Sequence, residues 1–154
     1  MAETLRPPKT SRHLDELKKW LRGELPPPPI VGLIGFHAVD FQLGTSTFEL
    51  LASSRHANPM GTLHGGIVCD LADIAMGTAM VSTLEDDETF TTLDLTAKYF
   101  KPIRNAKVTA RASVTKRTRT LGLVECEVTD EAGSLVAKAF STCMVLRGEQ
   151  AKGR

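Results

Sequence analysis

The chain has 154 residues, of which 42% are hydrophobic and 24% charged, with a formal net charge of +1. This length suits one domain around a single core, and the balanced charge gives no electrostatic basis for binding nucleic acid or a membrane surface. No apolar stretch resembles a signal peptide or reaches the roughly 18 residues of a membrane-spanning helix, so we expect no membrane partner.

The first 32 residues are predicted to form an N-terminal extension. Thr10 or Ser11 can cap a helix that runs to about Arg22. The four prolines at 26–29 forbid further helix and favour an extended polyproline segment. Two roles remain open for this extension. Its helix packs on the main domain, or the extension is an arm that docks a partner or covers a pocket.

From Gly35 onward, hydrophobic residues mostly recur with a period of two, which is typical of strands. The predicted strands cover residues 36–41, 45–52, 90–101, 107–116, 121–129 and 135–146, with the first two joined near Gly44. Short turns between the last four predict an antiparallel meander, because parallel strands need long crossovers. Residues 148–154 form a polar tail that we expect to fray.

Residues 64–84 show no strand alternation and contain no proline, which predicts a long and largely buried helix. The element order is therefore a short helix, two strands, one long helix and four strands. A twisted antiparallel sheet wrapped around one central helix accounts for this order most simply. We predict an α+β domain over residues 33–147.

Three cysteines, Cys69, Cys126 and Cys143, are widely spaced and form no CxxC pair. This pattern favours a reducing, cytoplasmic location over a disulfide framework, and we expect three buried packing thiols. The histidines lack the usual spacing of metal ligands, so no metal site is expected.

Asp73 is the most unusual residue of the long helix. On a helical wheel it shares its face with Gly66 and Gly77. A glycine inside a helix costs about 1 kcal/mol relative to alanine, so close approach of a backbone or a ligand is the expected reason. A carboxylate on an apolar helix is solvated, hydrogen-bonded or functional, and a structural role for Asp73 alone stays open.

Helix geometry separates Asp73 from the helix start. Gly65 precedes it by eight residues, which is about 12 Å along the axis. One reacting carbonyl therefore cannot contact the Gly65 amide and Asp73 of the same helix. A two-fold dimer with antiparallel helices would place Gly65 of one chain beside Asp73 of the other.

The pattern N-x-x-G-x-x-H-G-G-x6-D over residues 58–73 resembles the hotdog-fold acyl-CoA thioesterases. It is most similar to the branch named for phenylacetic acid degradation and its 4-hydroxybenzoyl-CoA thioesterase relatives. The likeness runs from about Gly35 to Leu146. It implies a hotdog fold, hydrolysis of an acyl- or aryl-acyl-CoA to free acid and CoA without metal or redox cofactor, and a homodimer, often a dimer of dimers (a homotetramer), with active sites between subunits.

The resemblance also implies a role for each site residue. The Gly65 amide would polarise the thioester carbonyl, and Asn58 would position the substrate or the attacking water. Asp73 of the partner would act as general base or attack directly to give an anhydride. His64 would support the helix start or touch the thioester, with a cap or core role as the alternative. Thr92 would bind the nucleophilic water.

Strand alternation places Thr92 on the polar face with Asp94 and Thr96. The phosphates of coenzyme A call for donors and basic side chains nearby. The candidates are Gly66 at the helix start, Lys98, Lys101 and Arg104 at one strand end, and Lys116, Arg117 and Arg119 in the next turn. For each of these basic residues, an ordinary solvated hairpin is the alternative.

Two other functions remain open. A non-catalytic acyl-CoA-binding hotdog protein would keep the pocket and the dimer but need no base. A hotdog enoyl-CoA hydratase or dehydratase would act on the acyl chain and leave the thioester intact, with a differently placed histidine. The presence of Asp73 and Thr92 favours the hydrolase.

Overall fold

A computed structural model describes residue 8 and residues 12–153. The elements in chain order are α1 (Arg12–Leu21), α2 (Pro29–Ile34), β1 (Phe36–Gln42), β2 (Thr45–Leu51), the 3-10 turn η1 (Ser54–His56), α3 (Gly65–Val81), β3 (Glu88–Tyr99), β4 (Lys107–Arg117), β5 (Leu121–Asp130), β6 (Leu135–Arg147) and η2 (Gly148–Ala151). The α+β class and the main elements are confirmed. The division of the chain at residues 32 and 147 stays a prediction.

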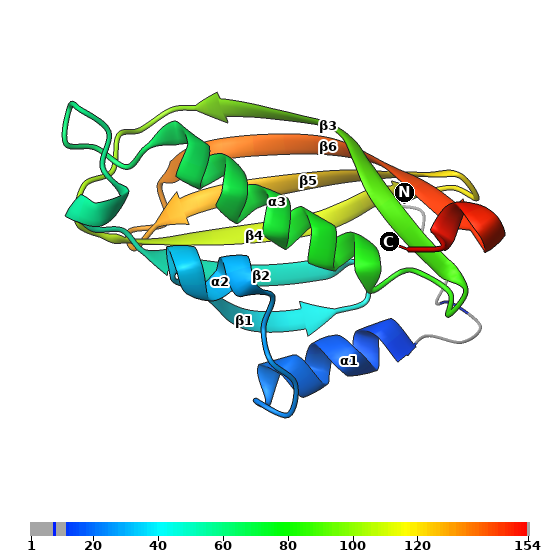
Figure 1. Cartoon of the computed structure of the whole chain (residues 1–154). Coiled ribbons are helices and arrows are strands. Elements are labelled where there is room, and N and C mark those ends of the chain that lie inside the picture. The colour runs from blue at the N-terminus through cyan, green and yellow to red at the C-terminus, as the bar shows by residue number, and fades with distance from the viewer. Residues whose placement is uncertain (1–7, 9–11, 154) are drawn as a thin grey trace.

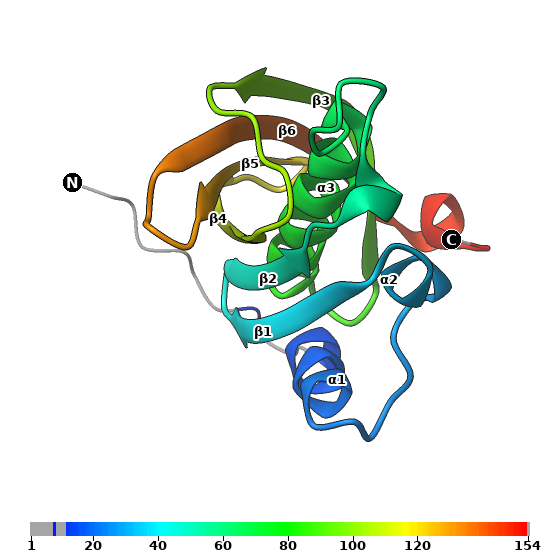
Figure 2. The same ribbon diagram turned by 90° about the vertical axis from the view of Figure 1, so that its left-hand side faces the viewer.

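The six strands form one antiparallel sheet in the order β1-β2-β4-β5-β6-β3. The sheet curls around α3, which lies in its concave face (Figures 1 and 2). Leu71, Ala75 and Ala79 on α3 are fully buried, as are Phe48 and Val108 on the sheet. The core therefore lies between α3 and the sheet, and among the described residues no further strand pairs with the outer side of β1 or of β3.

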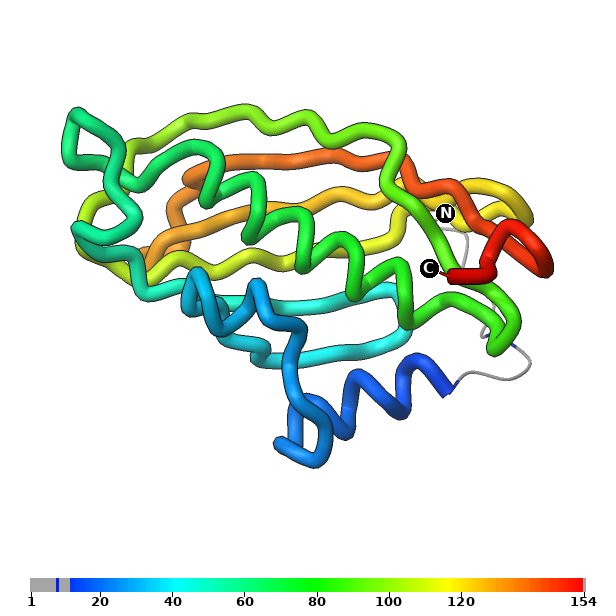
Figure 3. The backbone as a smooth tube through the Cα atoms, viewed as in Figure 1, coloured from blue at the N-terminus to red at the C-terminus, as the bar shows by residue number. Residues whose placement is uncertain are grey.

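The predicted meander is right for β4, β5 and β6 and wrong for β3, which pairs with β6 at the sheet edge. Residues 100–106 cross the end of the sheet instead of turning back on themselves. The carbonyl of Ile103 accepts a hydrogen bond from the Leu63 amide, and that of Ala106 accepts from Ala52. These bonds hold the crossing segment against the loop before α3, so the end of β3 lies beside the helix start (Figure 3).

Helix α1 packs under β1 through one apolar side (Figure 2). Leu17 is buried, and the Trp20 ring lies with its centroid 5.3 Å from that of Phe41 and 5.7 Å from that of Phe48. The Arg12 amide, at the first residue of α1, donates to a carboxylate oxygen of Asp86 at 2.7 Å. Of the two open roles for the extension, packing on the main domain is observed. The predicted capping residues at positions 10 and 11 lie outside the described residues.

Helix α2 was not predicted from the proline run. Pro29 is its first residue, a position that tolerates proline because the first helical amide needs no intrahelical acceptor. Gly35 follows the last residue of the helix and caps it, and its φ of +95° is the left-handed conformation that glycine adopts readily. The fourth proline therefore begins a helix, and Pro28 before it has the φ of −55° and ψ of 143° of extended polyproline chain. Within the part of the chain that the structure describes, no helix has the length and hydropathy to cross a bilayer.

Glu88, the first residue of β3, is a buried acid with two arginine partners. Its carboxylate binds Arg117 at 2.6 Å and also binds Arg147. Removing one member of a buried ion pair leaves the other charge uncompensated, so Glu88→Gln should lower the free energy of unfolding by about 3 kcal/mol. Urea unfolding measures this loss. The matched control is Glu149→Gln, whose exposed pair with Lys152 should contribute almost nothing, and equal losses would contradict the prediction.

Candidate active site

His64 caps α3 and thereby determines which amides stay available. Its Nδ1 accepts a hydrogen bond from the Gly66 amide at 2.9 Å, and its own amide donates to the His56 carbonyl. Among the described residues, nothing accepts from the Gly65 amide. The positive end of the helix dipole thus presents one free N–H group. Of the roles considered for His64, capping of the helix start is the one observed. The Gly66 amide is the donor in this cap.

Asn58 holds the loop that leads to the helix. Its Oδ1 accepts from the amides of Met60 and Thr62, and its Nδ2 donates to the Thr62 hydroxyl at 2.9 Å. One Nδ2 hydrogen has no acceptor within the described part of the chain. Asn58 therefore has a fixed orientation and lines the same cavity as Gly65, with one donor left for a ligand.

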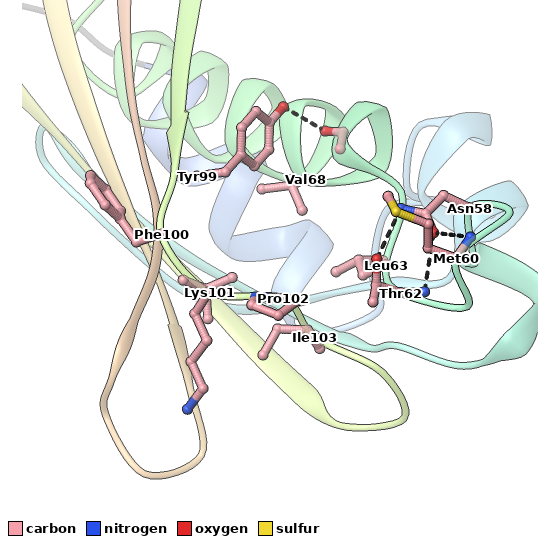
Figure 4. Close-up of a pocket in the computed structure, with 12 residues that line it drawn as sticks. Asn58, Met60, Thr62, Leu63, Val68, Tyr99, Phe100, Lys101, Pro102 and Ile103 are labelled. Carbon is pink, nitrogen blue, oxygen red and sulfur yellow. Dashed lines mark hydrogen bonds between the residues drawn. The ribbon is translucent and has the colours of Figure 1, made fainter.

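Tyr99 is a contact that the sequence interpretation missed. Its hydroxyl donates to the Gly65 carbonyl at 2.9 Å and lies 3.0 Å from the Cys69 sulfur (Figure 4). Partial burial, with the Cys69 contact adding to it, raises the pKa of Tyr99 to about 12, so the hydroxyl stays protonated. The only sequence signal was the position of Tyr99 on the helix-facing side of its strand. The expectation of three buried cysteines holds for Cys126 and Cys143, whereas Cys69 is half-buried.

Asn58, Gly65 and Tyr99 line a cavity of about 390 Å³, which we call the helix-start pocket (Figure 4). Its lining residues come from the 58–65 loop, the first turn of α3 and the segment after β3, and they are Asn58, Met60, Thr62, Leu63, Gly65, Val68, Tyr99, Phe100, Lys101, Pro102, Ile103 and Val136. The pocket is mainly apolar, and its few polar lining residues include Asn58, Thr62 and Tyr99. Such a combination is typical of ligand sites.

Two of the basic candidates lie at this pocket. Lys101 lines it, although its ammonium group extends away from the loop to an ion pair with Asp130. Arg104 donates to the Gly61 carbonyl at 2.9 Å and so holds the same loop. Lys98 lies on the outer face of the sheet, opposite Lys138.

The other three basic candidates, Lys116, Arg117 and Arg119, lie at the opposite end of α3. Gly122, just after their turn, lies against Met80 in the last helical turn. Arg117 is held by Glu88, as described above. The structure therefore does not bring the basic candidates of one chain into a single cluster.

Asp73 lies in a separate groove, which we call the Asp73 groove. The groove measures about 260 Å³ and is lined by Pro28, Ile30, Phe36, Asp70, Asp73, Ile74, Gly77, Thr78 and Val81. Although the residue is accessible on the single chain, partial desolvation of the carboxyl raises its pKa, and the charge of Asp70 raises it further. A carboxylate with a raised pKa is a better proton acceptor near neutral pH.

The expected position of Thr92 on the polar face with Asp94 and Thr96 is wrong. A β-bulge at Leu93 shifts the register of β3, so that Thr92 lies opposite Cys143. Side chains directly opposite each other point to the same side of a sheet, and Cys143 is buried on the side of α3. Thr92 therefore faces α3, whereas Asp94 and Thr96 face outward.

The bulge places Thr92 opposite Cys143, and the pKa of the Cys143 thiol responds to both Thr92 and Asp73. Burial raises the pKa of Cys143, the charge of Asp73 also raises it, and hydrogen bonds from Ser141 and Thr92 lower it. Asp73 and Thr92 thus lie toward the middle of α3, whereas Asn58 and Gly65 line the helix-start pocket. His64 caps the same helix start but lines a different cavity, together with Gly66 and Asp70. Within one chain Asp73 and Gly65 line different cavities, as the rise of α3 requires.

A curled antiparallel sheet around one central helix is the hotdog fold. Comparisons with known proteins show that the class is that of hotdog-fold thioester hydrolases. The Thioesterase superfamily profile matches residues 60–137. A 1,4-dihydroxy-2-naphthoyl-CoA hydrolase from Listeria monocytogenes is 27% identical over 112 residues, covering 73% of this chain and 89% of that protein.

Solved structures show the same fold. A phenylacetic acid degradation-related protein from Ralstonia eutropha JMP134 is 29% identical, with a TM-score of 0.75 over 82% of this chain and 97% of that chain. A thioesterase from Haemophilus influenzae is 23% identical and shares the fold alone, with a TM-score of 0.78 over 98% of this chain and 97% of its own. The protein belongs to the thioesterase superfamily.

Proposed function

We propose that the protein is an acyl-CoA thioesterase that hydrolyses an acyl- or aryl-acyl-CoA to the free acid and CoA. The observation that carries this proposal is the free Gly65 amide at the positive end of α3, together with the Asp73 carboxylate of raised pKa in an apolar groove. The first group stabilises an oxyanion, and the second activates a nucleophile. The reaction needs no metal or redox cofactor.

In the proposed reaction, the thioester carbonyl accepts a hydrogen bond from the Gly65 amide of one subunit. Asp73 of the other subunit takes a proton from a water held by Thr92, and the hydroxide attacks the carbonyl carbon. The carbon–sulfur bond then breaks, and the thiolate of CoA leaves and is protonated. Direct attack by Asp73, through an anhydride that water hydrolyses, is the alternative route.

The proposed assembly is a homodimer, or a dimer of two such dimers, in the cytoplasm. The two cavities lie on different parts of α3, so a two-fold axis that sets two α3 helices antiparallel would bring Gly65 and Asp73 together twice. Large apolar side chains near the open edge of β3 support this arrangement. Leu93, Tyr99 and Phe100 are each more than half exposed on the single chain.

The test of the proposed function is steady-state hydrolysis of short-chain, medium-chain and aryl CoA esters, followed by release of free thiol. We expect turnover with at least one class of ester. Tight binding of the esters without thiol release would identify a non-catalytic binder instead. Loss of the enoyl absorbance of crotonyl-CoA without thiol release would identify a hydratase.

Mixing two inactive variants tests the shared site. Asp73→Asn removes the base, and Gly65→Pro removes the amide hydrogen, so each homodimer should be inactive. After subunit exchange, about half of the dimers are mixed, and each has one intact site of two, so about one quarter of wild-type activity should return. Mixtures that stay inactive despite demonstrated exchange would contradict the shared site.

Thr92→Val tests the water-binding role that we propose for Thr92. The variant keeps the side-chain shape and removes the hydroxyl, so we expect kcat to fall about tenfold because the water is less well oriented. Thr96→Val, on the outer face of the same strand, is the matched control and should leave kcat at the wild-type value. Equal kcat values for Thr92→Val and wild type would remove Thr92 from the site.

A further inference from the structure

The Asp73 groove has a wall that does not come from the hotdog domain. Pro28 and Ile30, at the end of the proline run and the start of α2, line it opposite α3. The N-terminal extension therefore packs on the domain and also shapes the cavity that holds Asp73. Figure 1 shows α2 lying next to α3 on the open side of the sheet.

This wall is held in place by specific contacts. The Ser53 amide donates to Nδ1 of His56, so the Nε2 hydrogen of His56 donates to the Ile34 carbonyl at 2.9 Å, at the end of α2. Arg55 donates to the Leu33 carbonyl. Both bonds connect α2 to the segment just before α3, and α1 anchors the other end of the extension through Trp20. Ile30 therefore lies at a defined place in the groove.

The lining indicates what the groove accepts. Beyond Asp73 it follows α3 through Ile74 and Gly77 to Val81, with Ile30 and Phe36 on the other side. Its volume of about 260 Å³ exceeds the roughly 150 Å³ of an apolar cavity that binds benzene. Among the described residues no lysine or arginine lines it. Two carboxylates, those of Asp70 and Asp73, do.

We propose that the N-terminal extension, through Ile30, forms the distal wall of the acyl-binding groove and sets the size of the acyl group that the enzyme accepts. This inference rests on the proposed function. The acyl group bound there is uncharged and apolar. A free carboxylate at the far end of the acyl chain would lie close to the carboxylates of Asp70 and Asp73 without a compensating cation.

The test compares kcat/KM for butanoyl-, octanoyl- and tetradecanoyl-CoA in the full-length enzyme. Ile30→Phe should narrow the groove and lower kcat/KM for the longest ester that the wild type hydrolyses well by about tenfold, with little effect on butanoyl-CoA. Ile30→Ala should shift the preference toward longer esters. The matched control is Leu33→Ala on the same helix, which is 72% exposed and does not line the groove, and its profile should equal that of the wild type.

Gly77→Ala tests the same groove from its other side. A Cβ at this position would meet the Phe90 ring at 3.5 Å, an ordinary contact, so the fold accommodates it. Alanine also favours the helix, so the melting temperature should rise while kcat/KM for the long ester falls. This combination cannot come from misfolding, and it keeps the inference testable if Ile30 variants fold poorly.

Three outcomes are decisive. Unchanged chain-length profiles in Ile30→Phe and Gly77→Ala would overturn the inference and leave the proposed function standing. Hydrolysis of succinyl-CoA as fast as butanoyl-CoA would overturn the exclusion of charged acyl groups. A wild-type enzyme that hydrolyses none of the esters would overturn the proposed function and this inference together.

Discussion

Replacing Asp73 by asparagine is expected to lower kcat by about 100- to 10,000-fold, because the amide cannot take a proton from water or attack the thioester. Asparagine has nearly the same shape, so thermal unfolding and the affinity for a CoA ester should stay close to the wild-type values. Steady-state thiol release, thermal unfolding and equilibrium binding measure these three quantities. Wild-type turnover in Asp73→Asn would show that the assignment of the base is wrong.

The pH profile separates Asp73 from its neighbour Asp70. The proposed base must be ionised, so kcat/KM should rise with pH through the raised pKa of Asp73. Desolvation is the larger cause of this raised pKa, and the charge of Asp70 is the second. Asp70→Asn removes the second cause, so the acidic limb of the profile should move to lower pH. If the acidic limb lies at the same pH in Asp70→Asn and in the wild type, the limb reflects the ionisation of a group other than Asp73.

Replacing Gly65 by proline is expected to lower kcat/KM by about 100- to 1,000-fold, because proline has no amide hydrogen for the oxyanion. The backbone suits this change. Gly65 is the first residue of α3, a position that favours proline, and His64 before it has the extended ψ of 133° that proline requires of its neighbour. The substitution thus removes the catalytic donor without breaking the helix.

Gly65→Ala is the matched control, because it adds a side-chain carbon and keeps the amide hydrogen. That carbon would lie 3.2 Å from the Tyr99 hydroxyl, so Tyr99 must move by a few tenths of an ångström. We expect a much smaller loss of kcat/KM in Gly65→Ala than in Gly65→Pro. Equal losses in the two variants would indicate a steric effect and remove the oxyanion role from this amide.

Local patterns were sufficient for most of the fold. Alternation over residues 107–116 identified β4, and the apolar stretch from residue 64 identified α3, since each depends on contacts that recur along one element. The position of β3 was not predictable in this way. Its place beside β6 depends on a ladder that runs from Glu88 opposite Arg147 to Tyr99 opposite Ala137, between segments far apart in the sequence.

The candidate site shows the same division. The helix start and the separation of Gly65 from Asp73 follow from spacing and helix rise. The face of the sheet on which Thr92 lies depends on one inserted residue, Leu93. A bulge breaks strict alternation, so that residues before and after it no longer lie on the faces that alternation predicts for one continuous strand. The wall at Ile30 depends on how the extension returns to α3, which no periodicity within the extension encodes.

The open edge of β3 has a consequence for how the protein behaves on dilution. A free edge strand with apolar neighbours is a template for pairing with any other extended chain, and folded proteins normally cover or charge such edges. In the proposed dimer this edge and both active sites are completed by the same subunit contact. Specific activity should therefore decrease when the protein concentration is lowered below the dissociation constant of the dimer. Colloidal stability should decline over the same range of protein concentration.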